Sequence, residues 1–423
     1  MNSPHPVRPL IDNLFRREAG KMTAVLTRIF GPHNLELAED VVQDTLLKAL
    51  EHWKIQGIPD NPSAWMFTAA RNKALDVLRR ERHKKEFADH TSSLLRSEYS
   101  AAVTIDHLIQ SHDIQDEQLR MMFVCCHPGI PEEGQVALIL KTLCGFSVAE
   151  IAKAFLSNEE NITKRLYRAR EHFRENKVHF ELPPVHALEA RLNNVHTAIY
   201  LLFNEGYNAT HHEQLIRDDL VEEALRLGNM LVGNPVTRQP ESLALLALMC
   251  FQAARLYGRV DEHGNLKLLK DQDRTQWNQE LILQGEIFLN QSSGGDRISQ
   301  YHLEAAIAHE HCAAKDYQQT NWKSILQLYD WLLQVRANAV VSLNRLIAYA
   351  EVHGVKAALP EMEKLQADPA LKDYYLLYAT LGDWNAQTGN KEAAARLLNK
   401  AAALTQTPAE KNFLRGKIAE LMI

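Results

Sequence analysis

Residues 147–174 combine two amphipathic patterns, and the second of them carries a cationic face. Ser147 and Glu150 have the spacing of a capping box, and Ser157 or Asn158 can cap a second helix. The expected buried face of that helix is Ile162, Leu166, Ala169 and Phe173. The expected outward cations are Lys164, Arg165, Arg168, Arg170 and Arg174. Such a helix fits the DNA major groove, where these side chains bind phosphates and guanine edges. The alternative is a surface helix pair with a solvated run of charges.

A second basic face is expected on a helix that restarts at Asn61-Pro62-Ser63 and runs to about Arg82. Its outward positions are Trp65, Asn72, Asp76 and Arg79, flanked by Arg71, Lys73 and Arg80. An aromatic ring and an amide on a basic helix suit an unpaired base, because they supply stacking and edge hydrogen bonds. Alternatively, Trp65 packs against Trp53 in the core, and the residues from Arg79 onward form a solvated helix end.

The helix expected over residues 35–53 carries an unusual outward stripe. Asp40, Gln43, Asp44 and Leu47 follow one another at i, i+3, i+4 and i+7, opposite the apolar face. A stripe that joins acids to one large apolar residue serves either solubility or the docking of a basic partner.

Charge is distributed unevenly along this chain of 423 residues, whose formal net charge is −6. Residues 71–85 hold seven Lys/Arg against two Asp/Glu, and residues 164–177 hold six against two. Residues 186–423 hold 23 basic against 28 acidic side chains. Two basic islands in an acidic chain indicate local affinity for a nucleic acid rather than nonspecific electrostatic binding by the whole surface.

Other features limit the kind of protein. Five cysteines without a CxxC pair suit a reducing cytoplasm, and we expect no secretory signal or membrane span. Cys125 and Cys126 are adjacent, so small core-filling residues are favoured over a metal or redox site. The spacing of His302, His309, His311 and Cys312 is poor for a metal. No phosphate-binding glycine loop, carboxylate pair or nucleophile motif is present, so we expect no catalytic residue, cofactor or metal.

Helical periodicity dominates throughout, which predicts an all-α protein of several domains. We expect a helical unit over 1–85, a linker over 86–112, a second unit over 113–183, a helical segment over 184–300 and repeats over 301–423. The expected helices of the second half include 185–205, 213–231, 241–256, 271–289 and 300–314. Gly354 and Gly389 lie 35 residues apart, and each precedes an Ala-rich helix. This period is typical of a degenerate tetratricopeptide-like array.

Three motifs in order resemble a bacterial sigma factor of the extracytoplasmic-function (ECF) type. AEDVVQDTLLKAL (38–50) is similar to the polymerase-binding part of region 2, and NPSAWMFTAARNKALDVLRRE (61–81) to the part that melts and reads the −10 element. FSVAEIAKAFLSNEENITKRLYRAR (146–170) is similar to region 4, which reads the −35 element. Leu156 stands where many members have glycine, so the turn is expected to be wider.

The resemblance implies partners and residue roles. Core RNA polymerase would be bound through the β′ clamp and the β flap, with Asp40, Gln43, Asp44 and Leu47 facing the clamp. On promoter DNA, Asn72 would border the pocket of a flipped −10 base, which the loop 54–64 selects and Trp65 supports. Phosphates would be held by Arg79, Arg80 and Arg82. The region 4 contacts would come from Glu160, Asn161, Lys164, Arg165 and Arg168.

The second half resembles the extension of a sigma-factor group with fused tetratricopeptide-like domains of the DUF6596 type. Residues 261–282, with Trp277 expected to be exposed, and the segment LFNEGY (202–207) carry that resemblance. The extension would bind a peptide or protein and control the sigma domains; a purely structural lid is the alternative. Two other functions stay open for the whole chain: a one-component helix-turn-helix regulator with an effector domain, and an interaction scaffold without DNA binding.

Overall fold

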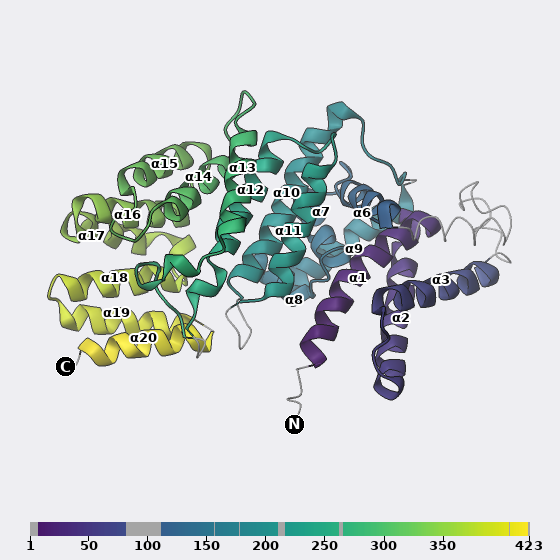
Figure 1. Cartoon of the computed structure of the whole chain (residues 1–423), viewed down its shortest axis with the longest axis horizontal. Helices are drawn as coiled ribbons and strands as arrows, with labels where there is room; N and C mark the ends of the chain where they lie inside the picture. Colours follow the sequence, from purple (N-terminus) through teal and green to yellow (C-terminus); the bar gives the residue numbers. More distant parts are fainter. Residues whose placement is uncertain are drawn as a thin grey trace. The chain divides into compact units, whose positions relative to one another are not determined.

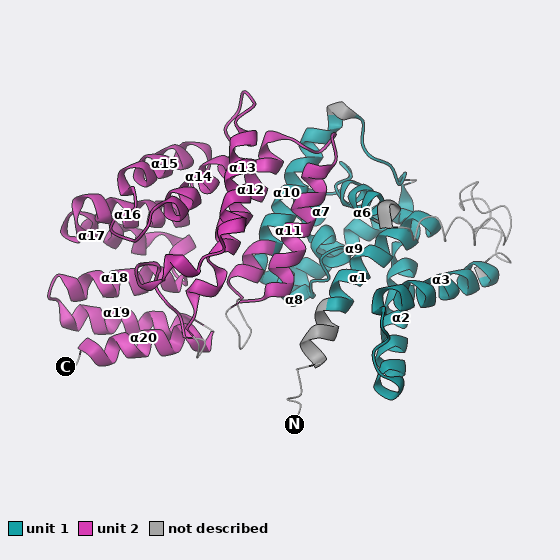
Figure 2. Cartoon of the chain, viewed as in Figure 1, with its two compact units in different colours: residues 1–202 teal, residues 203–423 magenta. Residues whose placement is uncertain are grey.

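A computed structural model describes residues 7–81, 111–155, 157–176, 178–209, 216–261, 265–405 and 407–421. Within these segments the chain is helical, and extended pairing is limited to a single bridge between Val260 and Leu266. The predicted all-α class is confirmed. The chain forms two compact units, residues 1–202 and 203–423 (Figures 1 and 2). Among the described segments, no helix has the length and apolar character needed to cross a bilayer.

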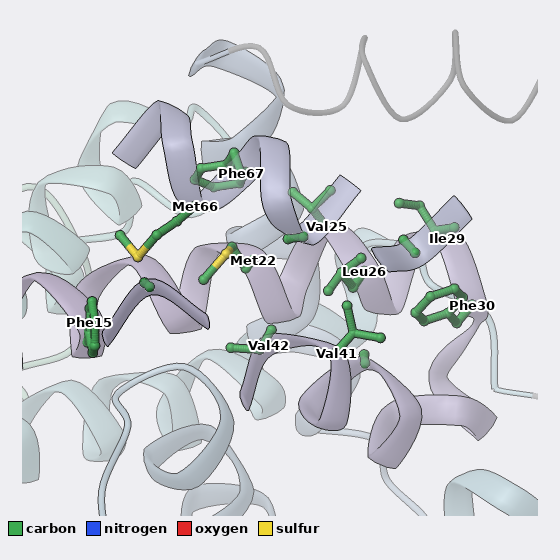
Figure 3. Close-up of a cluster of buried hydrophobic side chains, with 14 of the residues drawn as sticks. Phe15, Met22, Val25, Leu26, Ile29, Phe30, Val41, Val42, Met66 and Phe67 are labelled. Carbon is green, nitrogen blue, oxygen red and sulfur yellow. The ribbon is translucent and has the colours of Figure 1, made fainter. Parts of the chain in front are cut away.

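The first unit begins with three long helices joined by tight turns. Gly31 ends the first helix at φ 85° and Gly57 ends the second at φ 82°, a backbone region that favours glycine. Apolar residues from all three helices form one core, in which Met22, Met66 and Val41 are fully buried (Figure 3). The elements are α1 (Val7–Phe30), the 3₁₀ turn η1 (Pro32–Asn34), α2 (Leu35–Gln56) and α3 (Pro62–Glu81).

A second set of shorter helices follows in the same unit. The elements are α6 (Ser111–Cys125), α7 (Glu132–Thr142), α8 (Val148–Ala154) and α9 (Glu159–Glu175). The predicted capping box of α8 is confirmed, because Ser147 accepts from the Glu150 N–H and Glu150 accepts from the Ser147 N–H. Asn158 caps α9 by accepting a hydrogen bond from the Asn161 N–H. Leu156, where a wider turn is predicted, lies outside the described residues.

Cys125 and Cys126 are fully buried in this second set of helices. Burial raises the pKa of the Cys125 thiol to about 12, and it raises the pKa of Cys126 well above its ordinary value. Both thiols therefore stay protonated at neutral pH and fill the core, as the adjacent spacing predicts.

The helix α10 (Val185–Tyr207) begins directly after Pro183-Pro184, where the sequence interpretation places a domain boundary. The division between the compact units instead falls inside α10, between residues 202 and 203. Arg191 donates to the Phe123 carbonyl of α6, and Asn194 donates to Gln135 of α7 at 2.8 Å. These bonds tie the first part of α10 to the first unit.

The second unit is built around α12, most of whose side chains are buried. Its first helices are α11 (Asp218–Gly233), α12 (Pro240–Ala254), α13 (Gln279–Ser292) and α14 (Gln300–Ala313), with 3₁₀ turns η3 (Leu256–Arg259), η4 (Leu269–Asp271) and η5 (Arg274–Gln276). The helix predicted from Asp271 is wrong at its start, because η5 interrupts it. The Asn278 side chain caps α13 by accepting from the Leu281 N–H.

The prediction that Trp277 is exposed is also wrong: only 2% of the residue is accessible. The guanidinium of Arg274 lies 5.1 Å from the indole ring and that of Arg255 lies 5.8 Å from it. Arg274 also donates to the carbonyls of His311 and Ala314, so it joins the loop to the end of α14. The buried Trp277 ring is thus flanked by two cations, Arg274 from the polar stretch and Arg255 from the end of α12.

Helical hairpins complete the second unit. The elements are α15 (Trp322–Val335), α16 (Ala339–His353), α17 (Val355–Lys364), η6 (Leu365–Ala367), η7 (Pro369–Leu371), α18 (Tyr375–Gln387), α19 (Lys391–Leu404) and α20 (Pro408–Leu421). Gly354 turns α16 into α17 at φ 88°, and Gly389 turns α18 towards α19 at φ 89°. The period predicted from these two glycines therefore corresponds to two successive helical hairpins, α16–α17 and α18–α19.

Candidate nucleic-acid and polymerase interface

The exposed face of α9 carries four of the five residues expected to contact the −35 element. Glu160, Asn161, Lys164 and Arg168 are all exposed. Lys164 and Glu160 form an i, i+4 ion pair at 2.5 Å, with both side chains mainly in solvent. Such a pair contributes little to stability, so it leaves Lys164 available to a phosphate at small cost.

Arg165 differs from its neighbours, because 27% of its side chain is exposed. It forms an ion pair with Glu133 at the start of α7, and its guanidinium lies 5.5 Å from the centre of the Phe155 ring. Arg165 thereby connects α9 to the two preceding elements. In this structure its charge is engaged within the protein.

Arg170 was expected to point outward, and this is wrong. It donates two hydrogen bonds to the Glu39 carboxylate of α2, at 2.9 and 3.2 Å, and each of the two side chains is only 18% exposed. Arg174, one turn further on, pairs with Glu36 at 3.3 Å in a more exposed position. The last turns of α9 are thus tied to the start of α2.

Burial raises the pKa of the Glu39 carboxyl, and the Arg170 guanidinium lowers it in opposition. The pKa stays above its ordinary value because desolvation is the larger effect. The ionised carboxylate is therefore tolerated in this position chiefly through Arg170.

The basic face predicted for α3 lies on the surface. Asn72, Arg79 and Arg80 are exposed, and Asn72 accepts a hydrogen bond from Arg71 at 3.3 Å. Arg79 forms a weak pair with Asp76 at 3.4 Å. Arg82, expected to bind phosphate, lies outside the described residues.

Trp65 packs as the alternative interpretation states. Its ring lies edge-on to Trp53 at 5.6 Å between centroids and stacks on His52 at 5.2 Å. The residue is half-buried, so one part of the ring supports the core while another part remains at the surface of α3.

The acidic stripe of α2 lies on the surface. Asp40, Gln43, Asp44 and Leu47 are all exposed, and Leu47 is 59% accessible. Lys73 of α3 reaches Asp44 at 2.6 Å, so one member of the stripe is already neutralised. Three more apolar side chains near the C-terminal end of α2 are exposed, and the sequence interpretation missed them: Leu50, Ile55 and Ile58. Their positions outside the apolar face of the helix could have indicated this exposure.

Histidines form a pair at the end of α9 that spacing alone did not indicate. His172 Nε2 lies 3.0 Å from Nδ1 of His127, a residue of the turn between α6 and α7. Burial and the nearby His172 and Arg191 lower the pKa of His127, so the neutral form of His127 is favoured. Among the residues that the structure describes, no group of three His, Cys, Asp or Glu side chains is arranged to hold a metal ion.

These features define a helical protein with two basic helix faces and a separate exposed stripe of acidic and apolar side chains. Comparisons with known proteins agree with that class. Residues 14–84 match sigma-70 region 2, residues 120–173 match sigma-70 region 4, and residues 191–293 match a family of unknown function, DUF6596.

Two relatives extend the comparison. An uncharacterized protein of Rhizobium meliloti (strain 1021) is 33% identical over 388 residues, which cover 92% of this chain and 90% of the relative. The ECF RNA polymerase sigma factor SigL of Mycobacterium tuberculosis is 30% identical over 133 residues, covering 31% of this chain and 70% of SigL. No solved structure matches the chain significantly.

The chain belongs to the ECF sigma factors, in a form that carries a DUF6596 segment and a helical C-terminal extension. Sigma factors are initiation subunits that act with RNA polymerase on promoter DNA and are not themselves enzymes.

The Glu39–Arg170 pair yields a first prediction. Arg170→Met leaves a largely buried carboxylate without its cation, so the free energy of unfolding should fall by about 1–3 kcal/mol at neutral pH. Loss of Arg170 raises the native pKa of Glu39 further, so this loss of stability should diminish as pH falls from the Glu39 pKa of the variant towards that of the parent protein. Thermal or urea unfolding measures the effect.

Two variants control this experiment. Arg174→Met removes a more exposed pair and should cost less than about 1 kcal/mol. The double variant Glu39→Gln/Arg170→Met should recover much of the lost stability, because no charge remains to be desolvated. Equal losses for Arg170→Met and Arg174→Met would contradict the assignment.

Proposed function

We propose that this sigma factor directs core RNA polymerase to specific promoters through three separate surfaces and that its extension regulates the process. The observation that carries the proposal is the exposure of the α2 stripe and of the α9 basic face, while the opposite faces of both helices are buried. The chain performs no covalent chemistry in this scheme. Its contribution is to select where the polymerase starts.

The α2 stripe is the proposed docking surface for the β′ clamp of the polymerase. Asp40 and Asp44 supply negative charge, and Leu47 supplies apolar area at the same face. Opposite charges fix the register of a docked surface, and a buried apolar side chain contributes affinity. When the polymerase binds, Lys73 must either release Asp44 or stay paired with it inside the interface.

DNA contacts divide between α3 and α9. On α3, Asn72 would border a flipped −10 base while Arg79, Arg80 and Arg82 hold phosphates; Trp65 supports the site from its partly buried position. On α9, Glu160, Asn161, Lys164 and Arg168 would face the −35 groove. Arg165 is proposed to join them only after it leaves Glu133. Region 4 would also contact the β flap.

The extension is proposed as the regulatory part, with a peptide or protein as the partner of its hairpin array. The support is the acidic balance of residues 186–423, 23 basic against 28 acidic side chains, beside two basic islands in the sigma domains. The truncation experiment below shows whether the extension activates or restrains transcription.

The stripe is tested by the double variant Asp40→Ala/Gln43→Ala. Removing one charge and one amide from the docking face should weaken binding to core polymerase at least about tenfold, because interface anchors commonly carry more than 1 kcal/mol. Binding is measured with purified core enzyme. Transcription from a promoter library should fall in parallel with the loss of core binding. Lys356→Ala, exposed on α17, is the control and should change neither.

Unchanged core binding in the double variant would refute the docking role. Operator binding by the protein alone, with no polymerase recruited, would instead favour the one-component regulator.

Arg168 and Arg165 give a matched pair for the −35 contact. Arg168→Ala should lose about 1–3 kcal/mol of upstream DNA binding, because an exposed cation is removed, with no change in thermal stability. Arg165→Ala should lower the thermal stability of the region 4 helices and affect DNA binding less. Holoenzyme footprints and thermal unfolding measure the two effects. An upstream defect for Arg165→Ala as large as that for Arg168→Ala, at unchanged stability, would contradict this division.

Regulation is tested by a chain that ends at Ala209. A cut after Pro183 would also remove Arg191 and Asn194, whose hydrogen bonds tie α10 to the sigma domains. The shorter chain should initiate transcription at a markedly different rate from the intact protein. Equal rates at equal core binding would exclude a regulatory role for the extension.

A further inference from the structure

A cavity of about 390 Å³ lies within the second unit. Its wall is formed by one face each of the alternate helices α16, α18 and α20, with Val355 at the start of α17. The segment Leu266–Lys270 and the pair Tyr317 and Trp322 complete it. A volume of this size is in the range of small-molecule sites, which are concave, mainly apolar and equipped with a few polar groups.

Aromatic rings make up much of the cavity wall. They come from separate elements: Tyr317, Trp322, Tyr375, Trp384 and Phe413. Several are fixed by neighbours, since Tyr317 lies edge-on to Trp322 at 5.2 Å between centroids and Trp384 is buried. Fixed aromatic faces attract cations through their negative π surfaces.

Carboxylates outnumber cations around the cavity: Glu351, Asp383 and Glu410 against Lys270 and Lys417. Lys417 is already paired with Asp383. Glu351 and Glu410 accept hydrogen bonds from neutral hydroxyls instead, Glu351 from Tyr317 at 2.7 Å and Glu410 from Tyr375, Thr405 and Thr407. Within the described residues, neither has an ion pair. Glu410 also interacts electrostatically with the buried Arg259 guanidinium. The negative charge of Glu351 is oriented by its bond from Tyr317 and is not part of an ion pair in this part of the chain.

The chain itself shows how a cation fits here. The Lys417 ammonium lies 5.5 Å from the centre of the Phe413 ring while it pairs with Asp383. Ring and carboxylate thus hold an alkylammonium together at one end of the cavity. The same combination, with Glu351 in place of Asp383 and the rings of Tyr317 and Trp322 beside it, is present on the α16 side.

We propose that this cavity binds a small organic cation, an amine or guanidinium carried on an apolar or aromatic body. The cationic group lies beside Glu351 and the rings of Tyr317 and Trp322, and the apolar body fills the space along α18. An anionic ligand is disfavoured, because Lys417 is engaged by Asp383 and the remaining charge is negative. This inference concerns the extension alone and stands independently of the promoter-directing role.

The test is calorimetric titration of the full-length protein with three probes of one shape: 2-phenylethylamine, 2-phenylethanol and 3-phenylpropionate. The amine should bind at least about tenfold more tightly than the alcohol, and the carboxylate should bind most weakly. Glu351→Gln keeps the acceptor for Tyr317 but removes the charge. It should reduce amine affinity about tenfold and leave the alcohol unchanged. Ala379→Leu, which narrows the cavity on α18, should weaken all binding.

Circular dichroism and thermal unfolding should show that both variants remain folded. Lys356→Ala, on the exposed surface of α17, is the matched control and should bind the amine as the parent protein does. Equal affinities for amine and alcohol, tighter binding of the carboxylate, no saturable amine binding in the millimolar range, or an unaffected Glu351→Gln variant would each overturn the proposal.

Discussion

The two-sidedness of the α-helix is the constraint on which every site in this chain depends. Because residues three and four apart share a face, α2 and α9 can each bury one side in a core and keep the other for a partner. In α2, Val41, Val42 and Thr45 are buried while Asp40, Gln43 and Asp44 are exposed. The core thereby fixes which way the recognition residues point. A shift of the helix by one residue would turn its faces by about 100° and bring part of the recognition set into the core.

Features set by neighbouring residues could be predicted from the sequence. The capping box of Ser147 and Glu150, the exposed stripe of α2 and the two glycine turns of the hairpins all depend on residues within one or two turns of each other. Local spacing determines them because the chain itself holds such residues together. The sigma-factor class follows from three such local motifs in order.

Features set by long-range contacts could not be predicted in the same way. Glu39 and Arg170 are separated by 131 residues, so the burial of Arg170 depends on how α9 lies against α2. Trp277 stands in a polar stretch and was therefore expected at the surface, yet Arg255 and Arg274 from different elements cover it. The helix expected from Asp271 starts later because Asn278, rather than the acids before it, supplies the cap. In each case the deciding partner is distant or competes with a plausible local signal.

The segment Leu266–Lys270 belongs to the part of the chain that matches DUF6596, yet it forms a wall of the cavity between the hairpin helices. Residues 203–423 are accordingly one compact unit, although the sequence suggested a joint near residue 300. The helices α16 to α20 are therefore not expected to form an independently exchangeable module. Recombination that exchanged them between relatives would have to carry this strip of chain along, and the two stretches are expected to diverge together during evolution.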